Sequence, residues 1–182
     1  MQNFQKFFSA RALWALIVTI GAVMSGALTQ HVPQESRASH AGGAHHVSAR
    51  TTAHVAHVID GDTVQLSDGR LVRYIGIDTP ETGKGYAQTQ ECYAREATAR
   101  NRALVAGKDV LLERDVSDTD RYGRLLRYVY VGDTFVNAVL VRDGFARARR
   151  YPPDTVHADE FAALQERART QGKGLWGQCA RN

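Results

Sequence analysis

The hydrophobic pattern from residue 53 onward is that of short β-strands. Apolar and β-branched residues recur through residues 53–59 (AHVAHVI) and 63–77 (TVQLSDGRLVRYIGI), and Asp68-Gly69 inside the second stretch is a tight-turn signal. Residues 108–114 and 124–131 have the same character. The pattern therefore predicts five short strands.

Helices are predicted between and after these strands. Residues 93–106 contain neither Gly nor Pro, are rich in Ala, and stop at Gly107, a residue type that often ends helices. After a VGDT turn at 131–134, residues 135–143 predict a short second helix. A third helix is expected after Pro152 and Pro153, with a cap at Asp154 or Thr155 and an apolar stripe formed by His157, Phe161, Leu164 and Ala168.

The order of these elements predicts the fold class. Five strands, with one helix between the third and fourth and more helices at the end, match an OB-fold barrel. We therefore expect residues 53–182 to form one α+β, mostly β domain, a five-stranded OB-fold barrel with three helices. The chain shows no repeat at a fixed period, which disfavours a solenoid or propeller.

The first 29 residues have the pattern of an export signal. Lys6 and Arg11 precede an uncharged apolar run over residues 12–29, and small residues at Ser25 and Ala27 suit cleavage after Ala27. The run is also long enough to act as an uncleaved membrane anchor, and a buried core helix is a third interpretation. The segment predicts an exported protein, secreted or periplasmic, or tethered to a membrane through residues 12–29.

Residues 30–52 predict a flexible linker, because Ala, Ser, Gly and His dominate and no apolar period is present. Its four histidines, at positions 31, 40, 45 and 46, have irregular spacing. That spacing favours linker composition over a transition-metal site.

Composition allows a single packed domain but does not reveal its partner. The chain of 182 residues is 43% hydrophobic and 23% charged, and its isoelectric point is about 9.3. From Thr51 onward, however, 19 Lys and Arg residues stand against 18 Asp and Glu, a net charge of +1. The basic surplus lies mainly in the first 50 residues, so net charge alone does not indicate nucleic-acid binding.

Two cysteines, Cys92 and Cys179, are present. In an exported protein they can form a disulfide that ties the C-terminal tail to the domain. Two unpaired thiols are the alternative. No CxxC pair suggests zinc or a redox dithiol.

Carboxylates stand at the ends of two predicted strands, in VIDGDTVQL and YIGIDTPET. If these strands are neighbours, Asp62 and Asp78 converge, and paired carboxylates with a carbonyl and waters form a hard-cation site. Ca²⁺ or Mg²⁺ is favoured over zinc, because the motifs contain no His or Cys. The structural alternative is that each Asp caps its own turn.

Three further residues suit phosphate chemistry. Glu81 follows Thr79-Pro80 and can orient or deprotonate a water that attacks phosphorus. Arg73 and Arg124 can each contact two phosphate oxygens through a planar guanidinium. Singly, each arginine is more often a surface ion-pair partner.

Together, the motifs VIDGDTVQL, RYIGIDTPET, DRYGRLLRYVY and VNAVLVRDGFARA resemble the staphylococcal nuclease, or thermonuclease, family. The resemblance extends from about Val55 to Trp176, in the same order and at nearly the same spacing. It implies a five-stranded OB-fold barrel and a Ca²⁺-dependent endonuclease that acts on DNA, RNA or both and leaves 3′-phosphate ends. We also expect the protein to be a monomer.

The resemblance also implies roles for individual residues. Asp62 and Asp78 would bind Ca²⁺ through carboxylates and Thr79 through its carbonyl. Glu81 would activate water, while Arg73 and Arg124 would hold the phosphate and stabilise the transition state.

The chain departs from the family pattern at two places. The loop between Pro80 and Tyr93 is about one residue longer and poorer in lysine. Of the family's two nucleotide-packing tyrosines Tyr151 is present, while Arg149 stands at the other position. The predicted substrate contacts are therefore Tyr122, Arg149 and Tyr151. For Tyr122, packing in the core is an equally good interpretation. The competing interpretation is a catalytically inactive OB-fold module that binds nucleic acid or protein.

Overall fold

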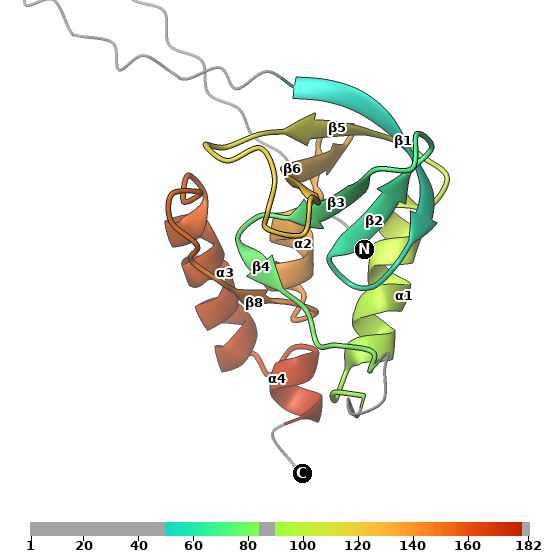
Figure 1. Cartoon of the computed structure of the whole chain (residues 1–182). Coiled ribbons are helices and arrows are strands. Elements are labelled where there is room, and N and C mark those ends of the chain that lie inside the picture. The colour runs from blue at the N-terminus through green and yellow to red at the C-terminus, as the bar shows by residue number, and fades with distance from the viewer. Residues whose placement is uncertain (1–49, 84–89, 180–182) are drawn as a thin grey trace, which may run out of the picture. The chain divides into compact units, whose positions relative to one another are not determined.

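A computed structural model describes residues 50–83 and 90–179, and in this part of the chain the strands close into a barrel (Figure 1). The strands are β1 (Arg50–Val58), β2 (Thr63–Leu66), β3 (Leu71–Tyr74), β4 (Ile77–Asp78), β5 (Asp109–Glu113), β6 (Leu125–Val131), β7 (Thr134–Phe135) and β8 (Arg147–Ala148). The main sheet has the order β3-β2-β1-β5-β6-β7, and a parallel pairing of β3 with β6 closes it. The closed ring consists of β1, β2, β3, β5 and β6, so the predicted five-stranded barrel with helices is confirmed.

The barrel interior is filled by alternate residues of its strands. Val55, Val64, Val72, Val110 and Val129 are each at most 1% exposed. Their β-branched side chains suit a pleated, half-buried surface. The first half of the long strand β1 pairs with β5 and the second half with β2. Within the β2 half, the register shifts between Val55 and His57, as at a β-bulge.

The helices are α1 (Ala94–Val105), α2 (Val136–Arg142), α3 (Ala158–Thr170) and a four-residue α4 (Leu175–Gln178). α1 lies along β1, and α2 lies between β6 and α3 (Figure 1). The three predicted helices are confirmed, with their stripe residue Phe161 fully buried. The short α4 was not predicted.

A second, two-stranded sheet positions the candidate site. β4 pairs antiparallel with β8, with Ile77 opposite Ala148 and Asp78 opposite Arg147. The backbone N–H of Arg149 continues this pairing by donating to the carbonyl of Gly76 at 2.9 Å. This small sheet brings the motif around Asp78 beside a segment about 70 residues later in the chain.

The structure differs from the sequence prediction at two boundaries. β1 begins at Arg50, inside the stretch assigned to the linker, because Arg50 pairs with Glu113 of β5 and its Nε lies 2.7 Å from the Glu113 carboxylate. The predicted cap of α3 is wrong. The N-terminal capping position is His157, while the Asp154 carboxylate accepts hydrogen bonds from the backbone of Val116 and Ser117.

The predicted signal or anchor over 1–29 and nearly all of the predicted linker lie outside the described residues. Across residues 50–83 and 90–179, no helix has the length and hydrophobicity needed to cross a membrane.

Cys92 and Cys179 are joined by a disulfide, with their Cα atoms 5.8 Å apart. The bond links the segment before α1 to the end of α4, across 87 residues of sequence. The alternative of two unpaired thiols therefore does not hold in the structure.

Candidate functional site

The turn from Asp60 to Asp62 presents one edge of the site. The Asp60 carboxylate accepts a hydrogen bond from the backbone N–H of Asp62 at 3.0 Å, and Asn101 of α1 donates to the Asp60 carbonyl at 2.9 Å. Between them, a Cβ on Gly61 would lie 2.6–2.8 Å from three side-chain atoms of Thr79. The glycine therefore allows the two motifs to approach closely.

Asp62 joins these two motifs directly. One of its carboxylate oxygens, Oδ2, accepts hydrogen bonds from the backbone N–H of Thr79 at 2.8 Å and from the Thr79 hydroxyl at 3.0 Å. The other, Oδ1, accepts from Thr63 at 3.2 Å. Asp62 is only 4% exposed, so these bonds offset the cost of burying the carboxylate.

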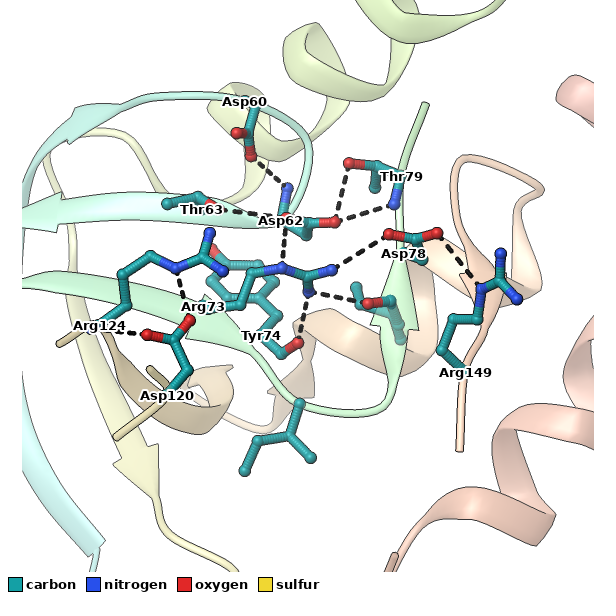
Figure 2. A network of polar contacts seen from close by, with 12 residues as sticks. Asp60, Asp62, Thr63, Arg73, Tyr74, Asp78, Thr79, Asp120, Arg124 and Arg149 are labelled. Carbon is teal, nitrogen blue, oxygen red and sulfur yellow. Dashed lines mark hydrogen bonds and ion pairs between the residues drawn. The ribbon is translucent and has the colours of Figure 1, made fainter. Parts of the chain in front are cut away.

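Arg73 lies between the two aspartates (Figure 2). Its Nε is 3.1 Å from Oδ1 of Asp62, and its Nη2 is 3.2 Å from Oδ1 of Asp78. Its Nη1 donates to the carbonyls of Tyr74 and Ile77, at 2.7 and 2.8 Å. The guanidinium is thus fixed at four points, and the two predicted carboxylates converge on it.

Several carboxylates lie close together around Arg73, and the pKa values of Asp62 and Glu81 are raised. Burial raises the pKa of Asp62 to about 6, and the nearby Asp60 adds to the rise while Arg73 opposes it. Partial desolvation, together with Asp60 and Asp78, raises the pKa of Glu81. Added positive charge near Asp62 and Glu81 would therefore favour their charged forms.

The donor set fits a hard divalent cation rather than zinc. Among the described residues, no three His, Cys, Asp or Glu side chains converge to hold a metal ion by themselves. Two carboxylates, those of Asp62 and Asp78, with a carbonyl at Thr79 and water, are the oxygen ligands that Ca²⁺ accepts. The surplus of carboxylates around the buried Asp62 is the observation that supports this fit.

Arg124 approaches the site from the start of β6 and is held by Asp120 (Figure 2). Its Nε lies 2.7 Å from Oδ2 of Asp120, and its backbone N–H donates to Oδ1 at 3.0 Å. Burial acts to raise the pKa of Asp120, but the hydrogen bonds from Arg124 outweigh it and lower that pKa below its ordinary value of 3.8.

A pocket of about 570 Å³ lies between the two arginines. Arg73 and Arg124 both line it, together with Tyr122 and Tyr151. The side chains of these tyrosines are open to solvent, since the residues are 68% and 54% exposed. Core packing of Tyr122, the alternative left open by the sequence, is therefore wrong.

The other predicted residues do not line this pocket: Asp62, Asp78, Thr79, Glu81 and Arg149. The Nε of Arg149 is 3.3 Å from Oδ2 of Asp78 (Figure 2). Glu81 is exposed, and its carbonyl accepts a hydrogen bond from the backbone N–H of Glu91 at 2.9 Å. Part of the longer loop, residues 84–89, lies outside the described residues.

Two residues of the site were not predicted from the sequence. Asp60 adds to the negative field, and its position two residues before Asp62 in the same motif was an available signal. Asp120 orients Arg124, and it stands four residues earlier in DRYGR.

The chain is similar to a known nuclease family and to several of its members. Residues 71–178 match the family model described as "Staphylococcal nuclease homologue". The thermonuclease of Staphylococcus hyicus is 38% identical over 128 residues, which cover 69% of this chain and 75% of that protein. The thermonuclease of Staphylococcus intermedius is 38% identical over 125 residues, covering 67% and 74%.

A longer relative is similar over part of its length. The SPbeta prophage-derived endonuclease YokF of Bacillus subtilis (strain 168) is 39% identical over 125 residues. The match covers 66% of this chain and 42% of the Bacillus protein.

Proposed function

Because the chain belongs to the staphylococcal nuclease family, we propose that it is a calcium-dependent endonuclease that hydrolyses phosphodiester bonds of DNA, RNA or both and leaves 3′-phosphate ends. The family and its endonuclease relatives make the chain a nuclease hydrolase. The dependence on Ca²⁺, the 3′-phosphate ends and the roles of individual residues are our proposal.

A single observation supports the site most strongly: two arginines face one pocket beside a cluster of carboxylates. Arg73 contacts both Asp62 and Asp78 and also lines the pocket, so it links the acidic edge to the cavity. Arg124 lines the same pocket. A phosphodiester between the two guanidiniums would lie next to the acidic residues.

Asp62 and Asp78, through carboxylates, and Thr79, through its carbonyl, would hold the Ca²⁺. When bound, the ion supplies positive charge that polarises the phosphoryl group and stabilises charge on its oxygens. Burial raises the pKa of Asp62 to about 6, and a bound cation would favour the charged form of this carboxylate.

The protein's own groups perform the remaining steps. Glu81, exposed near these carboxylates, would accept a proton from a water or orient it for attack on phosphorus. Arg73 and Arg124 would bind nonbridging oxygens as their charge grows in the transition state. The rigid contacts of both guanidiniums with aspartates keep them oriented before substrate arrives.

Binding of the nucleotide would use the exposed aromatic rings. Tyr122 and Tyr151 lie on the wall of the pocket, and aromatic rings stack on bases of any sequence. We further propose that the protein is exported and monomeric, with residues 12–29 as a cleaved signal or a membrane tether.

Digestion assays test the proposal. The full-length protein should cleave single-stranded DNA and RNA with Ca²⁺ present and stop when a chelator is added. Cleavage that continues undiminished under chelation would reject the cofactor. Glu81→Gln and Arg124→Ala should each lower kcat by at least about a hundredfold. The inactive binding module is not favoured, since such a module is expected to have lost at least one of the five acidic or arginine positions of the family, and all five are present.

A further inference from the structure

Both oxygens of the Asp78 carboxylate contact an arginine. Oδ1 is 3.2 Å from Nη2 of Arg73, and Oδ2 is 3.3 Å from Nε of Arg149. The two guanidiniums lie on opposite sides of the carboxylate (Figure 2). Both oxygens of Asp78, a proposed metal ligand, are therefore already paired with guanidinium groups.

The two arginines are not equally fixed. Arg73 makes four contacts, to two carboxylates and two carbonyls, and its side chain is only 15% exposed. The Arg149 side chain is 55% exposed and contacts the carboxylate of Asp78. An exposed ion pair of this kind is weak, so Arg149 is the contact that another cation displaces more readily.

The backbone keeps Arg149 within reach of Asp78 even when this contact is broken. Its N–H donates to the carbonyl of Gly76 at 2.9 Å, next to the paired strands β4 and β8. Release therefore requires only rotation of a long side chain. The freed guanidinium would remain at the edge of the active site, with an unsatisfied positive charge.

We infer that Arg149 couples cation binding to nucleic-acid binding. Without nucleic acid, its guanidinium competes with Ca²⁺ for Asp78. When Ca²⁺ binds, Arg149 is released and contacts a backbone phosphate of the substrate strand, for which a guanidinium is well suited. By thermodynamic linkage, a phosphate that holds Arg149 also makes Asp78 more available to Ca²⁺. The inference rests on the proposed calcium-dependent function.

Calorimetric titration of the full-length protein with Ca²⁺ tests this coupling without measuring activity. The titration is repeated with a short single-stranded DNA whose phosphorothioate linkages resist cleavage. Arg149→Ala should bind Ca²⁺ about two- to fivefold more tightly than the wild type when DNA is absent. Adding the DNA should tighten Ca²⁺ binding less in this variant than in the wild type.

Arg150→Ala is the matched control, since it removes the same charge from the next residue. Arg150 pairs instead with Asp159, 3.0 Å away, whose side chain is 98% exposed. Its Ca²⁺ affinity and its response to DNA should equal those of the wild type. If Arg149→Ala behaves like Arg150→Ala, or binds Ca²⁺ more weakly than the wild type, the inference is wrong.

Failure of the proposed function gives a different result. In that case the wild type shows no Ca²⁺ binding, or Asp78→Asn binds Ca²⁺ as the wild type does, and both proposals fall. Ca²⁺ binding that requires Asp78 but is indifferent to Arg149 overturns only the coupling.

Discussion

Asp120 holds Arg124 through both oxygens of a single carboxylate. Oδ2 lies 2.7 Å from Nε of Arg124, while Oδ1 accepts the backbone N–H of Arg124 at 3.0 Å and that of Tyr122 at 2.9 Å. The turn that carries Arg124 is therefore closed onto its own acidic residue. Arg124 is oriented toward the pocket by local contacts that do not require substrate.

Replacing this carboxylate should impair catalysis without unfolding the protein. In Asp120→Asn an amide oxygen can still accept the backbone bonds, but the charge-assisted bond to Nε is lost. We expect kcat/KM to fall about tenfold, which corresponds to roughly 1.4 kcal/mol of transition-state stabilisation. Steady-state cleavage of a defined oligonucleotide measures the change.

Asp118→Asn is the control for this prediction. Asp118 lies in the same turn and binds Nη2 of Arg127 through Oδ1, at 2.6 Å, but neither residue lines the pocket. Its kcat/KM should stay close to that of the wild type. Equal losses in the two variants would mean that Asp120 acts through the stability of the turn.

The Asp120–Arg124 contact should also make stability depend on pH. The folded-state pKa of Asp120 lies below its ordinary value of 3.8, so the stabilisation is fully present above that value and is lost as pH falls through the lower folded pKa. The gap in the free energy of unfolding between wild type and Asp120→Asn should be constant near neutral pH and shrink below about pH 4. Urea unfolding across this range measures it, and a gap that widens on acidification contradicts the assignment.

The barrel and the proximity of Asp62 to Asp78 were predictable from local sequence pattern. Alternating β-branched residues give the five strands, and the Gly-free run before Gly107 gives α1. Asp62 and Asp78 stand at strand ends, and these ends are neighbours in the structure. These local preferences are reliable predictors here, because each of them agrees with the barrel fold as a whole.

Contacts that depend on long-range pairing were beyond the sequence. Arg149 meets Asp78 only because two-residue strands, β4 and β8, pair across the domain, and such short strands carry no periodic signal. Asp154 looked like a helix cap. Its carboxylate instead accepts hydrogen bonds from the backbone of Val116 and Ser117, nearly 40 residues earlier in the chain. A capping residue and a tertiary anchor have the same local sequence signature.

Removal of the disulfide should destabilise the domain strongly. Cys92 and Cys179 are 87 residues apart, and closing a loop of that length restricts the unfolded chain by about 4 kcal/mol in the chain-entropy model. We expect the Cys92→Ser, Cys179→Ser double variant to lose about this much free energy of unfolding in urea. Each single variant should lose a similar amount, because either one breaks the bond. A loss below about 1 kcal/mol would show that the bond contributes little.

Gly61→Ala should damage the site through a single methyl group. The added Cβ would lie 2.6–2.8 Å from Oγ1, Cβ and Cγ2 of Thr79, so the Asp60–Asp62 turn must move away from the residue that binds Asp62. Overpacking of this kind costs about 1–3 kcal/mol of stability, and cleavage should fall at least tenfold because Asp62 and Thr79 separate. Gly69→Ala is the comparison. An alanine is strained at the φ of +87° found at Gly69, but its Cβ would meet no atom within 4 Å. That variant should lose stability and keep its activity. A Gly61→Ala enzyme with wild-type kcat/KM would show that the close approach of Gly61 to Thr79 is not needed for catalysis.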